Sequence, residues 1–85
     1  MDHVGTVIDR LIKQQGMTQK ELSERSGITT GHLSLIVSGK CVISIPSAVA
    51  IANGLRVISA REILNHQTEY QLNQYEESLT HAQET

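Results

Sequence analysis

Thr18–Val37, TQKELSERSGITTGHLSLIV, is a segment whose spacing predicts two short helices joined by a tight turn. Thr18 carries the side-chain oxygen that favours a helix N-cap, and Glu21 is placed to bond back to the Thr18 amide, which makes a capping box. Gly27 lies where the first helix must end and the chain reverse, a position whose positive φ favours glycine. We expect Leu22 to point inward from this first helix.

The second half of the segment predicts another helix with one apolar side. Thr29 or Thr30 can cap its start, and Gly39 closes it. The apolar residues of this helix recur at three- and four-residue spacing and are Leu33, Ile36 and Val37. Two helices joined by a short, glycine-containing turn form a helix-turn-helix unit, whose second helix can enter the DNA major groove. The same pattern also fits a helical hairpin packed in a small bundle.

The length and composition of the chain favour one small domain without a membrane segment. Eighty-five residues allow one domain with a modest core, and the lack of Phe and Trp leaves aliphatic side chains to fill it. No run of about twenty apolar residues is present, so we expect no membrane span. The N-terminus lacks a basic and apolar signal sequence, so we expect a cytoplasmic protein.

The distribution of reactive and metal-binding residue types argues against an enzyme. Cys41 is the single cysteine and cannot form an intramolecular disulfide. The histidines are scattered without a zinc-type spacing, and they are His3, His32, His66 and His81. No nucleophile–base pattern, paired carboxylates or phosphate-cradling loop stands out. We therefore expect no metal, no cofactor and no catalytic residues.

The charge is divided unevenly along the chain, whose formal net charge is −2. Residues 1–65 hold all seven Lys and Arg side chains against five Asp and Glu, a net of +2, whereas residues 66–85 hold four Glu and no base, a net of −4. We interpret 1–65 as a helix-turn-helix DNA-binding domain and 66–85 as an acidic C-terminal helical tail. A net of +2 predicts few phosphate contacts and weak non-specific binding to DNA.

A helix is also predicted on the N-terminal side of the central segment. Asp2 can cap a helix that runs to about Gln15, and Gly16 ends it. The residues expected on its buried face are Val4, Val7, Ile8, Leu11 and Ile12.

A fourth helix is predicted after the loop 40–43. Ser44 can cap it, and Pro46 lies in the first turn, where a missing N–H costs nothing. We expect Gly54 to end this helix and Leu55 to fold back on it. The residues expected to pack inward are Ala48, Val49, Ile51 and Ala52.

Ser59 and Glu62 form a second capping box, which predicts a fifth helix with Ile63 and Leu64 apolar. The whole chain then reads as an all-α, compact five-helix bundle with a C-terminal helical extension. The extension has apolar residues at 3-4-3 spacing, namely Leu72, Tyr75, Leu79 and Ala82. Two such heptads are too short for an independent coiled coil.

Two interpretations of the extension remain open. Leu72 and Tyr75 either pack on their own domain or form a homodimer or partner contact. We expect the last five residues to be disordered.

The central segment resembles the Cro/repressor (Xre) helix-turn-helix family. The resemblance lies in the motif T-Q-x-E-L from Thr18 to Leu22, in Gly27, and in S-G-K after the second helix. Segments 3–8, 39–44 and 59–72 are further similar to HigA/VapI-type antitoxins. The resemblance implies a bundle of the lambda-repressor-like type and a dimer that represses its own operon. It also implies, for many members, a second role in neutralising an mRNA-cleaving toxin encoded beside them.

The resemblance also places the DNA-binding surface on the second helix of the unit, 29–37, and its flanks. The residues predicted to contact double-stranded DNA are Gln19, Thr29, Thr30, Gly31, His32, Ser34, Leu35, Ser38 and Lys40. Lys40 is equally compatible with a solvated surface lysine, and His32 with a merely exposed histidine. We expect Gln19 to contact a phosphate, and the helix 29–37 itself presents no Arg, Asn or Gln that could read a base with two hydrogen bonds. We therefore expect specificity to need a dimer on a pseudo-palindrome with half-sites about 34 Å apart.

Two functions stay open at this point. One is an autoregulatory repressor, and the other is an antitoxin whose main contact is a toxin. The acidic tail or the first helix is the candidate surface for such a partner, because an acidic tail suits a basic ribonuclease.

Overall fold

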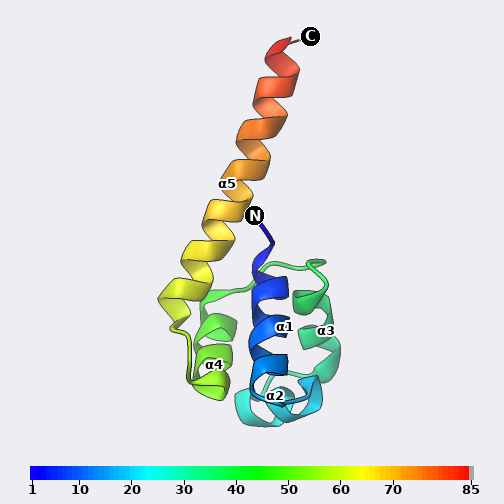
Figure 1. Ribbon diagram of the computed structural model, residues 1–85, viewed down its shortest axis with the longest axis vertical. Coiled ribbons are helices and arrows are strands. Elements are labelled where there is room, and N and C mark those ends of the chain that lie inside the picture. The colour runs from blue at the N-terminus through cyan, green and yellow to red at the C-terminus, as the bar shows by residue number, and fades with distance from the viewer. Residues whose placement is uncertain (85) are drawn as a thin grey trace.

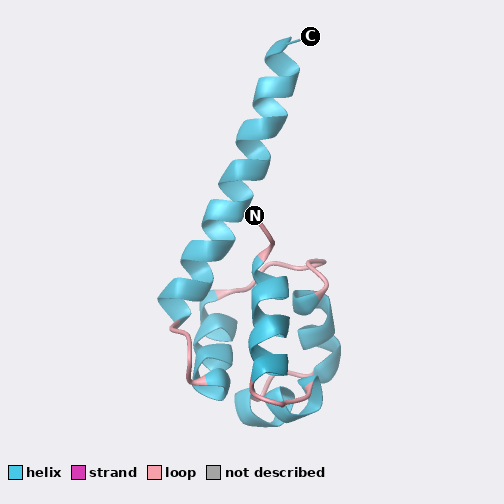
Figure 2. Cartoon of the chain, in the orientation of Figure 1, coloured by secondary structure: helices cyan, strands magenta, loops and turns pink. Residues whose placement is uncertain are grey.

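The computed structural model describes the backbone of residues 1–84 and the side chains of residues 1–79. The described residues form five α-helices and no strand, which confirms the predicted all-α fold (Figure 1; Figure 2). The helices are α1 Val4–Gln14, α2 Gln19–Ser26, α3 Thr30–Val37, α4 Ile45–Leu55 and α5 Ala60–Glu84. The first four helices and the start of α5 form a bundle, and the rest of α5 projects away from it (Figure 1). The described chain is therefore elongated, at 48 × 22 × 22 Å.

Side-chain caps define where two of the helices begin, as the sequence predicts. Thr18 caps α2, because its hydroxyl accepts a bond from the Glu21 amide at 3.1 Å. The Glu21 carboxylate meets the Thr18 hydroxyl at 3.4 Å rather than the Thr18 amide, so that capping box is formed on one side only. At the start of α5 the box is complete, since Ser59 and Glu62 exchange bonds of 3.0 and 3.4 Å between side chain and amide.

The predicted cap of α4 is confirmed, whereas the predicted cap of α1 is wrong. Ser44 caps α4 by accepting from the Ser47 amide at 3.3 Å, with Pro46 in the first turn. Asp2 does not cap α1, because the helix begins later and its N-cap residue is His3, which makes no side-chain cap bond. The Asp2 carboxylate instead pairs with Arg10 at 3.2 Å.

The end of α4 also differs from the prediction. Gly54 does not end the helix, which continues through Leu55 before Arg56 adopts a left-handed conformation with φ of 66°. Packing explains the difference: Gly54 is buried with the Leu22 side chain against it, and Leu55, only 1% exposed, completes the last turn inside the core. Val49 is 45% exposed, so the prediction that it packs inward is wrong.

The core consists of hydrophobic side chains from all five helices and two connecting loops. In the packing, α4 lies against α2 and α5, while α1 lies against α3 and α5. Of the predicted face of α1, Val7 and Leu11 are only partly buried. The buried hydrophobic residues are Val4, Ile8, Ile12, Met17, Leu22, Leu33, Ile36, Ile43, Ala48, Ile51, Leu55 and Ile63.

Helices α1 and α3 approach closely at Gly5. A Cβ atom built on Gly5 would lie 2.1 Å from the Ile36 carbonyl oxygen and 2.8 Å from the Val37 carbonyl oxygen. These are backbone atoms, so neither contact can be relieved by turning a side chain. The absence of a side chain at Gly5 therefore lets α3 lie close against α1.

Beyond the bundle, α5 exposes its apolar residues. Leu72, Tyr75 and Leu79 are 48%, 64% and 44% exposed, so they do not pack closely on their own domain. The boundary predicted between residues 65 and 66 falls inside the continuous helix α5, and the separate role of 66–85 stays a prediction. The Ala82 side chain lies outside the described residues, as does all of Thr85. The backbone is helical to Glu84.

Candidate nucleic-acid interface

The turn between α2 and α3 is fixed by local hydrogen bonds. Gly27 ends α2 with φ of 78°, the left-handed conformation predicted for it. The Ser23 hydroxyl donates to the Ile28 carbonyl, and the Ser26 hydroxyl accepts from the Ile28 amide at 3.2 Å. Thr29 then caps α3 by accepting from the His32 amide at 3.2 Å. The two helices are thus joined by a short and well-bonded turn, as in a helix-turn-helix unit.

Helix α3 separates a buried side from an exposed side. Leu33 and Ile36 are 0% and 1% exposed and hold the helix on the core. The remaining predicted contacts on α3 are all exposed to solvent, and they are Thr30, Gly31, His32, Ser34 and Leu35. A Cβ atom built on Gly31 would meet no atom within 4 Å, so another surface could approach the backbone closely at this point. This is the arrangement that a helix needs to enter a groove of DNA.

The predicted residues that flank α3 differ in how free their side chains are. Gln19 is partly buried at the first position of α2. The Thr29 hydroxyl is used in the cap of α3, and the Ser38 hydroxyl donates to the Leu35 carbonyl at 3.1 Å. Lys40 is exposed, and its amide donates to the Leu35 carbonyl at 2.9 Å. The described geometry therefore fixes the Lys40 backbone at the end of α3 and leaves its ammonium group in solvent.

Ion pairs within the chain determine which Lys and Arg side chains remain unpaired for contacts with phosphates. Arg10 pairs with Asp2 at 3.2 Å, and Lys13 pairs with Asp9 at 2.9 Å, so both cations of α1 are offset by acids. Lys40, beside α3, takes part in no ion pair among the described residues. Positive charge is thus available at the end of α3.

Sequence reasoning missed a contact between α5 and the loop that follows α3. The Gln67 carboxamide accepts from the Ile43 amide at 2.6 Å and donates to the Ile43 carbonyl at 2.9 Å. The available signal was its spacing, because Gln67 lies four residues after Ile63 and so shares the inward face of α5.

A groove and the placement of the metal-binding residue types are further features of the described residues. An open groove of about 580 Å³ lies between the end of α4 and the start of α5, where the Ser59 hydroxyl is already used in its helix cap. Within the described residues, no three His, Cys, Asp or Glu side chains lie together as a metal site would require. Likewise, the described part of the chain holds no helix that is both long and apolar enough to cross a membrane.

Comparison with known proteins identifies the family of the chain. A family model described as helix-turn-helix matches residues 8–63, which include α2, α3 and α4 entirely. No match was found among curated proteins or among solved structures. Because the family model covers more than half of the chain, the chain belongs to the Cro/C1-type helix-turn-helix family, a family of DNA-binding transcription regulators.

Proposed function

We propose that this protein is a repressor that binds a pseudo-palindromic operator as a homodimer and regulates its own gene. The observation that carries the proposal is the exposed side of α3, with Thr30, Gly31 and Ser34 in solvent opposite the buried Leu33 and Ile36. A helix held on the core by one side presents the other side to the major groove.

The chemistry of this exposed side predicts how bases are read. Thr30 can donate to or accept from a base edge, and its methyl group can contact the methyl of thymine. Leu35 offers only an apolar contact, which again suits a thymine methyl. Ser34 adds a weaker donor, and Gly31 allows the backbone to come close. Such a surface reads few bases per monomer, so two half-sites are needed for specificity.

Phosphate contacts position the protein and add affinity without reading sequence. The candidates for such contacts are Gln19, the first residue of α2, and Lys40, which follows α3 in the chain. His32 and Ser38 are the further candidates on the same surface. With so few cations, the salt dependence of binding is expected to be modest.

The direct test uses labelled duplex DNA from immediately upstream of the gene, at two salt concentrations, with a scrambled duplex as competitor. We expect binding that resists the competitor and is lost in a Thr30→Ala/Ser34→Ala double variant. The matched control is Thr68→Ala/Ser78→Ala, which removes the same two side chains from exposed positions of α5. Binding no tighter than to the scrambled duplex contradicts the repressor proposal.

The proposed dimer contact is the apolar stripe of α5, which consists of Leu72, Tyr75 and Leu79. All three are exposed and recur at three- and four-residue spacing. Because Ile63 anchors the helix in the core, the projecting part extends a helix that is already nucleated. A short apolar seam can then associate without having to form the helix first.

The dimer contact is tested by sedimentation of a Leu72→Glu variant. We expect Leu72→Glu to be monomeric at a concentration where the wild type is dimeric, because it places a charge in the seam. The control Gln74→Glu adds the same charge to a neighbouring exposed position outside the stripe and should remain dimeric. A Leu72→Glu variant that stays dimeric removes Leu72 and Tyr75 as the contact.

A second candidate function is that of an antitoxin, in which the stripe binds a toxin instead of a second copy. The supporting observation is the projecting helix itself, which joins exposed apolar residues to four Glu and no base within 66–85. A basic ribonuclease is the partner that this charge suits. Co-expression with a small reading frame beside the gene should relieve its toxicity, and Leu72→Glu should abolish the relief. Absence of a neighbouring toxin-sized frame counts against this function.

A further inference from the structure

We propose that Gln67 is a positioning residue for DNA binding. Gln67 holds the loop 38–43, which follows α3, so that Lys40 in this loop meets a phosphate. The proposal rests on the proposed function of α3 as the recognition helix. It adds a residue from α5, outside the helix-turn-helix unit, to the parts on which DNA binding depends. The carrying observation is the pair of hydrogen bonds from one carboxamide to both backbone groups of Ile43.

A glutamine side chain is suited to this task because its amide has a donor and an acceptor, as a peptide group does. With Oε1 at 2.6 Å from the Ile43 nitrogen and Nε2 at 2.9 Å from the Ile43 oxygen, Gln67 satisfies both groups at once. The Ile43 side chain is only 3% exposed, so the backbone groups beside it have limited access to water. Without the carboxamide, the Ile43 amide and carbonyl would lose their hydrogen-bond partners. We expect the loop to shift so that both groups can bond elsewhere.

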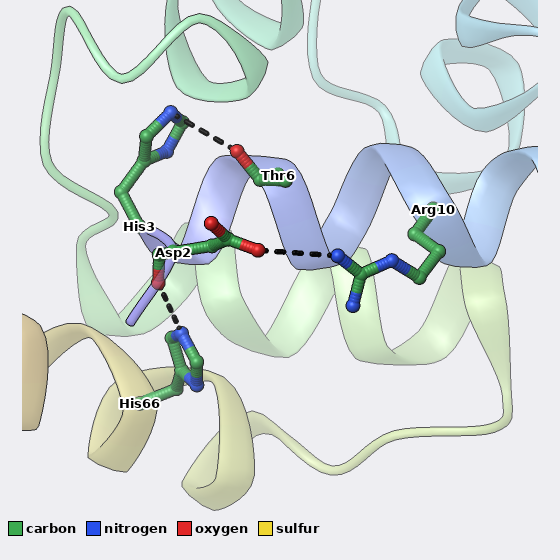
Figure 3. Close-up of polar contacts among 5 residues, drawn as sticks. All are labelled: Asp2, His3, Thr6, Arg10 and His66. Atoms are coloured by element: carbon green, nitrogen blue, oxygen red, sulfur yellow. Dashed lines mark hydrogen bonds and ion pairs between the residues drawn. The ribbon is translucent and has the colours of Figure 1, made fainter.

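The loop is also held at its other end. The His3 ring lies against Gly39, with three ring atoms 3.0 to 3.1 Å from the position of a Gly39 Cβ. His3 in turn contacts the Thr6 hydroxyl at 3.2 Å (Figure 3). The His3 ring also meets the Tyr70 ring edge-on, with centroids 6.1 Å apart. Lys40 therefore lies between an anchor at Gly39 and an anchor at Ile43.

The first three turns of α5 supply both anchors. Gln67 bonds the loop directly, and Tyr70 packs on the His3 ring that contacts Gly39. His66 adds a bond of 2.6 Å between its Nε2 and the Asp2 carbonyl, which keeps the N-terminal segment in place beside them (Figure 3). Because Ile63 buries the start of α5 in the core, these side chains are attached to a rigid support. The DNA-binding surface is thus braced by a helix that does not touch DNA in our account.

The test combines Gln67→Met, Lys40→Ala and the double variant in the operator-binding assay. Methionine keeps the length and packing of glutamine without its donor and acceptor. We expect Gln67→Met to weaken operator binding by about threefold to tenfold, because Lys40 is then no longer held in position for its phosphate contact. If Gln67 acts through Lys40, the double variant should bind no more weakly than the weaker single variant.

Two further readouts separate positioning from general stability. The salt dependence of binding should fall by about 0.9 in log–log slope in both single variants, the loss of one phosphate contact. Gln74→Met, at an exposed position with no described hydrogen bond, is the matched control and should leave both readouts unchanged. Thermal melting of Gln67→Met accompanies the assay, and binding is measured at a temperature at which the variant is folded.

The outcomes divide as follows. Wild-type protein that does not prefer the operator overturns the proposed function and this inference together. Wild-type protein that prefers the operator, with Gln67→Met binding equally well, overturns this inference alone. Losses from Gln67→Met and Lys40→Ala that multiply in the double variant show independent effects and also overturn it.

Discussion

The bundle and the projecting part of α5 are both helical, but for different reasons. In the bundle, short helices of 8 to 11 residues are held by burial of side chains such as Leu33 and Ile51, both 0% exposed. The projecting part buries little, since Leu72, Tyr75 and Leu79 remain about half exposed, and it is helical as the extension of an anchored helix. The bundle is thus held by buried side chains of its own, whereas the projecting part leaves its apolar side chains in solvent.

The largest expected effect compares the same substitution in the two regions. Leu33→Ala should lower the free energy of unfolding by about 3–4 kcal/mol, because it leaves a cavity at a fully buried site. Leu72→Ala should change the stability of the isolated monomer by less than about 0.5 kcal/mol, because its side chain is 48% exposed. Urea unfolding measures both changes in the free energy of unfolding. The protein concentration is kept low enough that the chain is monomeric. Equal losses in the two variants would mean that the projection is part of the core.

The next effect concerns how closely the bundle is packed. Gly5→Ala should lower the free energy of unfolding by about 3 kcal/mol, because its Cβ would lie 2.1 Å from the Ile36 carbonyl oxygen and would push α3 away from α1. Thermal melting followed by circular dichroism measures the loss. Gly31→Ala is the control, since a Cβ there meets nothing within 4 Å, and it should have no destabilising clash. Equal melting temperatures for Gly5→Ala and the wild type would contradict the close approach of the two helices.

The smallest effect tests local strain at the end of α4. Arg56→Gly should raise the free energy of unfolding by about 0.5–1 kcal/mol, because Arg56 has φ of 66° and glycine adopts this conformation without a steric cost. Arg61→Gly, at an exposed position in the first turn of α5, should have the opposite sign and lower it by less than about 1 kcal/mol. Urea midpoints give both values. A loss of stability in Arg56→Gly would show that its side chain contributes more than its backbone conformation costs.

Much of the helix-turn-helix could be predicted because local chemistry and packing agree there. Thr18, Gly27 and Thr29 mark the ends of α2 and α3 by capping and by positive φ, and each does so in the structure. The exposed side of α3 followed from the spacing of Leu33 and Ile36. The predicted contacts on α3 therefore lie on one exposed surface, although their role in DNA binding stays a prediction.

The remaining features depend on contacts between residues distant in sequence. Gly54 looks like a helix end locally, but burial of Leu55 carries α4 one residue further and imposes the left-handed conformation on Arg56. Asp2 looks like a cap, but it pairs with Arg10 instead. Gln67 is a polar residue with no local sign of a partner, but in the structure it accepts a hydrogen bond from the Ile43 amide. Local spacing can place Gln67 on the inward face of α5, but it does not identify Ile43, distant in sequence, as the partner.

The central claim is that α3 and its flanks form the DNA-binding surface. The most direct measurement is an NMR titration of ¹⁵N-labelled protein with the operator duplex, following each backbone amide. We predict the largest shifts at the start of α2, along α3 and at Lys40, with smaller shifts along α1. Shifts concentrated on α1 or on the projecting part of α5, with α3 unchanged, would contradict the account.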